Sequence, residues 1–200
     1  MQTETVKKAL GGTADAALPV LSVSAPFSRT ATFPAGPVSV RDMAGLYIYD
    51  NTLMAVKLTG AQLKEYLEYS AKYFNQLAPG APVDIATLTN AGGTPDYNYD
   101  QLAGVTYDID VAKPVGQRIT GLSYRGQPVA ADQQFAVAIN NYRQSGGGGF
   151  PHVTTAPVLY NAQVEIRQAL IDYATATGTI DPATFAEADW KLTRDGVPVF

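Results

Sequence analysis

A strand and a helix follow each other directly between Thr52 and Phe74, and this pair constrains the fold more than any other feature. Residues 52–59 read Thr-Leu-Met-Ala-Val-Lys-Leu-Thr, which is typical of a strand. Thr59 is a favourable N-cap residue. After it, residues suited to one buried helix face recur at three- and four-residue spacing: Leu63, Tyr66, Leu67, Ser70, Tyr73 and Phe74. A strand that feeds into an amphipathic helix predicts a sheet covered by helices.

Other segments extend this pattern on both sides. We expect strands at residues 20–25, 105–111, 118–124 and 135–139, and helices at residues 3–10, 39–44 and 164–175. The run 135–139 is almost wholly apolar, as a central strand would be. Loops are expected at residues 26–37, 90–101 and 140–151. Because no repeat or long linker divides the chain, residues 1–200 are predicted to form one α+β domain, a mixed β-sheet with packed helices.

The charge balance argues against a polymeric nucleic acid as partner. The chain has 14 Lys and Arg against 18 Asp and Glu, a net charge of −4, and no run of basic residues. A single nucleotide, in contrast, needs only a pocket. No apolar run approaches the roughly 20 residues that span a bilayer, so no membrane span is expected. Residues 1–10 lack the apolar core of a signal peptide, so any export signal is expected further upstream.

The side chains needed for hydrolytic chemistry are scarce. The chain has no Cys and one His, His152. Zinc, iron and manganese hydrolase centres draw on several His together with carboxylates, so no metal site is predicted in this chain. A Ser/His/Asp triad is not expected either, because no Gly-x-Ser-x-Gly sequence is present. The sequence therefore predicts no catalytic residue here.

Aromatic residues next to an asparagine form the first candidate binding segment, Tyr47-Ile48-Tyr49-Asp50-Asn51-Thr52. If the segment is extended, Tyr47 and Tyr49 lie on the same side. They could form a stacking surface for a flat base beside Asn51, whose amide can donate and accept hydrogen bonds. They could equally be ordinary strand aromatics.

The second segment is the glycine-rich stretch Asn140–Pro151, with four consecutive glycines at residues 146–149. Four glycines cost backbone entropy, which a close approach of the backbone to a ligand or a positive-φ path would offset. It is not a P-loop, because no Gly-Lys-Ser/Thr follows and no helix is expected to open there. It follows an apolar strand, where α/β sheets commonly bind ligands. A flexible tether is the alternative.

The third segment runs from Pro95-Asp96-Tyr97-Asn98-Tyr99-Asp100 to the strand that contains Asp108 and Asp110. Its acidic residues could suggest a metal site. Without His, a solvated edge or a set of hydrogen-bonded turns fits better.

Together, these segments resemble the C-terminal domain of the 5'-nucleotidase superfamily. The resemblance lies in Tyr49–Leu53 followed by Lys57–Glu68, in Gly104–Asp110, and in Asn140-Asn141-Tyr142-Arg143 with residues 146–151. Tyr-Asp-Asn-Thr and Asn-Asn-Tyr-Arg, together with residues 95–100, are most similar to the 2',3'-cyclic-nucleotide 2'-phosphodiesterase/3'-nucleotidase branch. The 5'-nucleotidase branch tends to have Pro-Phe-x-Asn in the first segment and a Phe in the glycine-rich loop.

The resemblance implies roles for individual residues. Tyr49 and Tyr142 would sandwich the base, and Asn51 would hydrogen-bond its edge. The pocket would be lined by Gly104 and by the backbone of Gly146, Gly147, Gly148 and Gly149, with Arg143 and Arg29 as weaker candidates. Gly148 stands where some 5'-nucleotidases have Asp, so no side-chain contact to a ribose hydroxyl is implied there.

The resemblance also implies a partner domain. An N-terminal metallophosphatase domain of the same polypeptide, absent from this chain, would hold two divalent metal ions, and this chain would hold the nucleotide or nucleoside. Such a protein would be extracellular, periplasmic or in the cell wall. A free-standing binding module and a purely structural domain, with both tyrosines in its core, are the competing hypotheses. Under each of them the isolated chain is expected to hydrolyse nothing.

Overall fold

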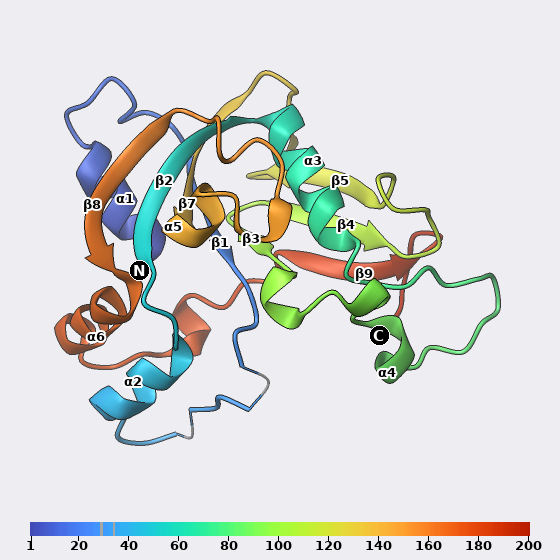
Figure 1. Ribbon diagram of the computed structural model, residues 1–200, viewed down its shortest axis with the longest axis horizontal. Coiled ribbons are helices and arrows are strands. Elements are labelled where there is room, and N and C mark those ends of the chain that lie inside the picture. Colours follow the sequence, from blue (N-terminus) through green and yellow to red (C-terminus); the bar gives the residue numbers. More distant parts are fainter. Residues whose placement is uncertain (29, 34) are drawn as a thin grey trace.

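Two five-stranded mixed sheets organise the chain in the computed structural model, which describes residues 1–28, 30–33 and 35–200 (Figure 1). The first sheet has the order β3-β1-β7-β2-β8. Its strands are β1 (Val20–Ser24), β2 (Thr52–Thr59), β3 (Gln101–Ala103), β7 (Gln134–Asn140) and β8 (Val158–Glu165). Strand β7 lies at the centre of this sheet. It pairs parallel with β1 and antiparallel with β2.

The second sheet has the order β10-β9-β4-β5-β6. Its strands are β4 (Thr106–Asp110), β5 (Ile119–Tyr124), β6 (Gln127–Pro128), β9 (Trp190–Arg194) and β10 (Val197–Pro198). Strand β4 pairs antiparallel with β5 and parallel with β9, which lies close to the C-terminus.

The helices of the described residues are α1 (Gln2–Leu10), α2 (Val40–Leu46), α3 (Gly60–Ala71), α4 (Ile85–Leu88), α5 (Asn141–Gln144) and α6 (Ile166–Thr177). Helix α3 begins with a capping box, in which Thr59 Oγ1 accepts from the Gln62 N–H and Gln62 Oε1 accepts from the Thr59 N–H. Helix α2, expected at residues 39–44, begins with a capping box of Ser39 and Asp42. None of the helices in the described part of the chain is long and apolar enough to cross a membrane.

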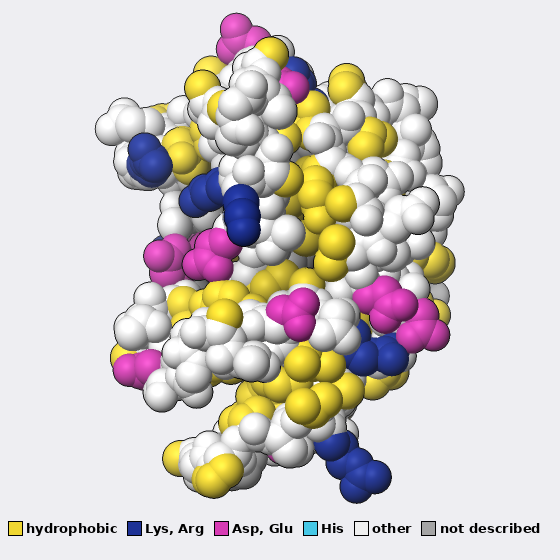
Figure 2. All heavy atoms as spheres, turned by 90° about the vertical axis from the view of Figure 1, so that its left-hand side faces the viewer, with side chains coloured by type: hydrophobic (Ala, Val, Ile, Leu, Met, Phe, Trp, Pro, Cys, Tyr) yellow, Lys and Arg dark blue, Asp and Glu magenta, His cyan; other side chains and the backbone are white. Residues whose placement is uncertain are grey.

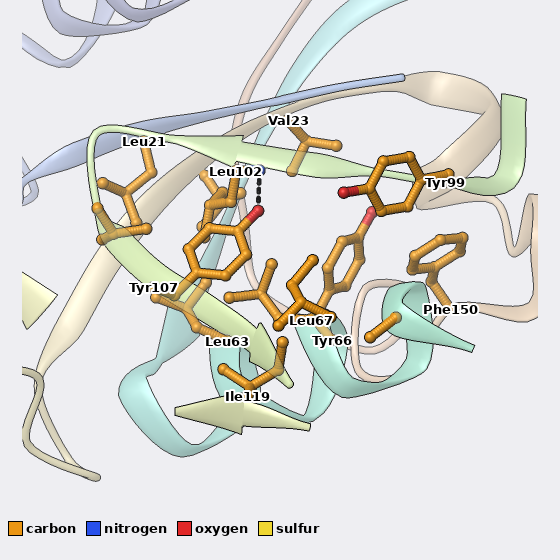
Figure 3. Packing of buried hydrophobic residues seen from close by; sticks show 14 of the residues in the cluster. Leu21, Val23, Leu63, Tyr66, Leu67, Tyr99, Leu102, Tyr107, Ile119 and Phe150 are labelled. Carbon is orange, nitrogen blue, oxygen red and sulfur yellow. Dashed lines mark hydrogen bonds between the residues drawn. The ribbon is translucent and has the colours of Figure 1, made fainter. Parts of the chain in front are cut away.

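The first sheet is buried on both faces, and its strands β2 and β7 are mostly apolar and buried. Met54, Val56 and Leu58 of β2 share a core with α3 and the second sheet, whereas Leu53 and Ala55 pack with α1 and α6 on the other face. Figure 3 shows the first of these cores, where Tyr66 and Leu67 of α3 lie among residues of both sheets, among them Leu21, Val23, Leu102, Tyr107 and Ile119.

The α+β class is confirmed, and the strands divide between two sheets. The helix expected at residues 164–175 starts at Ile166, because residues 158–165 form the edge strand β8. This strand alternates poorly between buried and exposed residues, has register shifts against β2, and contains Gln163 at a φ of 55°. The prediction also missed β3, at the end of the expected 90–101 loop, and strands β9 and β10 near the C-terminus.

Candidate functional site

The start of β2 and the end of β7, two inner strands of the first sheet, bring together two of the three candidate segments. In the antiparallel pairing of β2 and β7, Leu53 lies opposite Asn140. The start of β2 therefore adjoins the end of β7, and the segments around Tyr49 and Tyr142 lie close to each other. The Thr52 N–H donates to Asn141 Oδ1 across the gap at 2.9 Å.

The glycine-rich segment is an ordered turn built on a short helix. Asn140 caps α5, since its Oδ1 accepts from the Arg143 N–H at 2.7 Å. The expectation that no helix opens here is thus corrected, although α5 spans only residues 141–144 and is followed by no phosphate-binding sequence. Gly146 then adopts a φ of 102°, and residues 147–149 form a 3-10 turn.

Tyr142 lies flat over one of the glycines and exposes its ring. A Cβ atom at Gly147 would come within 2.6 Å of Tyr142 Cδ1, so the absence of a side chain there lets the ring rest on the backbone. Tyr142 is 44 % exposed. The core position that a purely structural domain would require is therefore contradicted for Tyr142.

Arg143 holds the loop and has no N–H left for a ligand. Nε and Nη2 donate to the two carboxylate oxygens of Asp100 at 2.8 and 2.7 Å. Nη1 donates to Gly147 O and Asn98 Oδ1, and Nη2 also donates to Tyr97 O. These bonds occupy the five guanidinium N–H groups. Although burial lowers the pKa of Arg143, the Asp100 carboxylate holds it above its usual value. Arg143 was expected to contact the ligand, but its hydrogen bonds indicate that it positions the loop instead.

Asp100 anchors this network in the core. Its carboxylate also accepts a hydrogen bond from Tyr66 of α3, and the Asp100 carbonyl accepts from Ser70 Oγ at 2.6 Å. Burial, and then the nearby Asp100 carboxylate, raise the pKa of Tyr66 well above its usual value, so this phenol stays protonated. The third sequence segment is therefore hydrogen-bonded as expected, but Asp100 is buried and does not lie at a solvated edge.

The segment around Tyr49 is held by a helix that the motif analysis did not include. Arg167 of α6 donates to the carbonyls of Tyr47 and Ile48 and to Asp50 Oδ1. Tyr47 ends α2, so the segment is not the regular strand that alternation assumed. Tyr47 is buried, while Tyr49 is 38 % exposed.

The side chain of Asn51 is oriented by Tyr47. Both Asn51 Nδ2 and Asn140 Nδ2 donate to Tyr47 Oη, at 3.1 and 3.0 Å. Burial raises the pKa of Tyr47, and the two amide hydrogen bonds only partly offset it. The Asn51 amide is thereby tied to the core next to exposed Tyr49.

Gly104 lies away from this cluster. It follows β3, whose pairing with β1 places Ser24 opposite Gln101 and Ser22 opposite Ala103. Gly104 therefore lies beside Leu21, toward the start of β1, whereas the cluster lies at the opposite end of the sheet. The expectation that Gly104 lines the same pocket is corrected. Arg29 lies outside the described residues.

The remaining ionisable candidates have structural partners. Asp108 lies 3.5 Å from Lys191 Nζ, and Asp110 Oδ1 accepts from the N–H groups of Ala112 and Asp195. His152 Nε2 lies 2.6 Å from Glu65 Oε2. Within residues 1–28, 30–33 and 35–200, no three His, Asp or Glu side chains are grouped as a metal site would require. Charged side chains of both signs are dispersed on the face in Figure 2.

Sequence reasoning missed several residues that build the site. Asp100 and Tyr66 fix Arg143, Arg167 fixes the Tyr49 segment, and Tyr97 lies edge-on to Tyr49 with 6.5 Å between ring centroids. The one available signal was the aromatic and acidic segment 95–100. Most of the partners are dozens of residues apart in the sequence, and only the tertiary fold brings them together.

Comparisons with known proteins agree with this architecture. A sequence profile described as "5'-nucleotidase, C-terminal domain" matches residues 4–155. The trifunctional nucleotide phosphoesterase protein YfkN of Bacillus subtilis is 40% identical over 195 residues, which cover 88% of this chain and 13% of that protein. A 2',3'-cyclic-nucleotide 2'-phosphodiesterase/3'-nucleotidase of Haemophilus influenzae is 36% identical over 202 residues, covering 88% of this chain and 30% of the relative.

A solved structure is similar as well. A Staphylococcus aureus protein with a provisional assignment as a 5'-nucleotidase superposes with a TM-score of 0.72 and 30% identity, over 96% of this chain and 36% of that one. The chain thus spans about a third or less of the relatives it matches. The profile match over most of its length, together with the shared fold, shows that the chain belongs to the family of 5'-nucleotidase C-terminal domains.

Proposed function

We propose that this chain is the nucleoside- or nucleotide-recognition domain of a phosphohydrolase that acts on 2',3'-cyclic nucleotides and 3'-nucleotides. One observation carries the proposal: two exposed tyrosines, Tyr49 and Tyr142, flank the adjoining ends of β2 and β7, close to Asn51. Stacking of a base between aromatic rings contributes about 1–3 kcal/mol per base. The names of the Haemophilus influenzae and Bacillus subtilis relatives support this class of substrate.

In this proposal the two tyrosines sandwich the base, Asn51 meets its edge, and the backbone of residues 146–149 lines the pocket. Arg143 positions the loop. The hydrolytic step belongs to a separate N-terminal metallophosphatase domain with two divalent metal ions, because the described residues of this chain do not provide a matching set of ligands. A location in the periplasm, in the cell wall or outside the cell belongs to the same proposal.

The site is open to solvent, as half of a binding site would be. Two surface cavities of about 280 and 320 Å³ lie elsewhere and share no lining residue with the Tyr49–Tyr142 cluster. An open half-site should bind weakly, at about millimolar concentration, near 4 kcal/mol.

Titration calorimetry of this chain with adenosine and 3'-AMP tests the proposal. We expect saturable binding in the wild type and its loss in Tyr142→Ala, because one stacking partner is removed. Gly147→Ala should also weaken binding, since the new Cβ would displace the Tyr142 ring. Gly45→Ala is the matched control, because a Cβ there meets nothing within 4 Å.

Equal binding by Tyr142→Ala and the wild type would contradict the proposal. A free-standing binding module without a catalytic partner is the second candidate, because the same exposed aromatics would serve it. It predicts the same calorimetry but no hydrolytic domain in the complete polypeptide. The complete polypeptide's sequence therefore decides between the two.

A further inference from the structure

The exposed tyrosines of this protein are concentrated at one place. Of 12 tyrosines in the sequence, those with strongly exposed side chains are Tyr49, Tyr97 and Tyr142, at 38, 42 and 44 %. Two of them form the proposed base sandwich. The third is Tyr97, which lies on the 3-10 turn η2 (Asp96–Asn98). The proposed function assigns no ligand contact to this turn.

Tyr97 is fixed to both halves of the candidate site. Its ring meets Tyr49 edge-on, with 6.5 Å between centroids and 69° between planes. Its carbonyl accepts from Arg143 Nη2 at 2.9 Å, and Arg143 directly follows Tyr142. Since Arg143 also binds Gly147 O, one guanidinium sets the position of Tyr97 relative to the glycine-rich loop.

Asn98 follows Tyr97 directly, and the orientation of its side-chain amide is set by Arg143. Its Oδ1 accepts from Arg143 Nη1 at 3.2 Å, and a Cβ at Gly148 would lie 2.7 Å from that oxygen. Arg143 can only donate, so the Asn98 oxygen must face it and the NH2 group must face away. None of the hydrogen bonds found among residues 1–28, 30–33 and 35–200 uses Asn98 Nδ2. Asn51 is the reverse case, because its Nδ2 is bound to Tyr47.

We propose that Tyr97 and Asn98 form a third wall of the nucleoside site and help to determine its specificity. The Tyr97 ring contacts the nucleoside beside Tyr49, and Asn98 Nδ2 donates to an acceptor atom of it. The inference rests on the proposed function and adds to it a polarity: this wall favours a nucleoside that presents a ring nitrogen, a carbonyl or a hydroxyl oxygen there, and disfavours one that presents only a donor.

Adenosine titrations of the 200-residue chain test this wall. Tyr97→Ala should weaken adenosine binding about 2- to 10-fold, the range of an aromatic contact, and Tyr97→Phe, which keeps the ring, should restore most of the affinity lost in Tyr97→Ala. Asn98→Asp keeps an acceptor for Arg143 but removes the donor, so binding should again fall about 2- to 10-fold. Phe200→Ala, which removes an exposed aromatic that lines a separate cavity, should leave the affinity unchanged.

Tyr142→Ala, measured in parallel, separates this inference from the proposed function. If Tyr142→Ala abolishes binding while Tyr97→Ala and Asn98→Asp bind like the wild type, the third wall is wrong and the sandwich stands. If the wild type itself does not bind adenosine, both are overturned. Thermal unfolding midpoints close to that of the wild type show that the losses are local.

Discussion

Arg143 is a buried residue that can position the proposed binding site without contacting the ligand itself. All of its N–H groups are used inside the protein, and its ion pair with Asp100 is almost fully buried. A buried pair is no strong source of stability by itself, but removal of one partner leaves an uncompensated charge. The network therefore holds the loop around Tyr142 in place, and removal of either charged partner should destabilise the protein.

Arg143→Ala should lower the free energy of unfolding by about 3–5 kcal/mol, because it leaves the Asp100 carboxylate buried and unpaired. Urea unfolding followed by circular dichroism measures this loss. The matched control is Lys113→Ala, which removes the half-exposed pair with Asp195 and should cost less than about 1 kcal/mol. If both variants lose a similar free energy of unfolding, the Asp100–Arg143 pair does not stabilise the loop more than a surface pair would.

At the scale of elements, helix α3 connects the sheet to the site. It follows β2 without a loop, and it supplies Tyr66 and Ser70 to Asp100 and Tyr69 to Gly148 O. The capping of the N-terminus of α3 is therefore expected to influence both the core and the glycine-rich turn.

Thr59→Ala should destabilise the protein by about 1 kcal/mol, since the Gln62 N–H loses its cap. Differential scanning calorimetry would detect this as a lower melting temperature. Thr179→Ala serves as control, because Thr179 is exposed and follows α6. A melting temperature equally unchanged in both variants would contradict the capping role.

The elements differ in how well the sequence predicts them, for physical reasons. Strand β2 and the Thr59 cap of α3 follow from local periodicity and local hydrogen bonds, and the sequence predicts both closely. Strand β8 is an irregular edge strand with little alternation, so its pattern merged with the following helix. The sequence indicates Tyr142 as a candidate site residue, whereas the positioning role of Arg143 depends on Asp100, which lies 43 residues away.

At the scale of the whole molecule, the chain has a proposed binding site but only sparse ligands for a metal. Its single histidine is paired with Glu65. Recognition and hydrolysis would then be separable functions of a longer polypeptide.

We therefore expect the isolated chain to release no phosphate from 2',3'-cyclic AMP, with or without added Mn²⁺, because its described residues form no group of His, Asp or Glu side chains that could hold a water-activating metal ion. A phosphate assay against a buffer blank measures this, with a two-domain enzyme of the family as positive control. Metal-stimulated release that persists through purification and disappears in His152→Ala would overturn the expectation.

The parallel pairing of β1 with β7 has a consequence for the time course of folding. Val20 pairs with Ala136, which lies 136 − 20 = 116 residues later. Contacts this distant in sequence slow folding, because a long loop must close before the pairing stabilises anything. At a synthesis rate of about 5–20 residues per second, β1 is made roughly 6–23 s before it can pair with β7, although its other partner, β3, is made earlier. During synthesis, one side of this apolar strand thus stays unpaired for many seconds, so the risk of aggregation is greatest before β7 has been made.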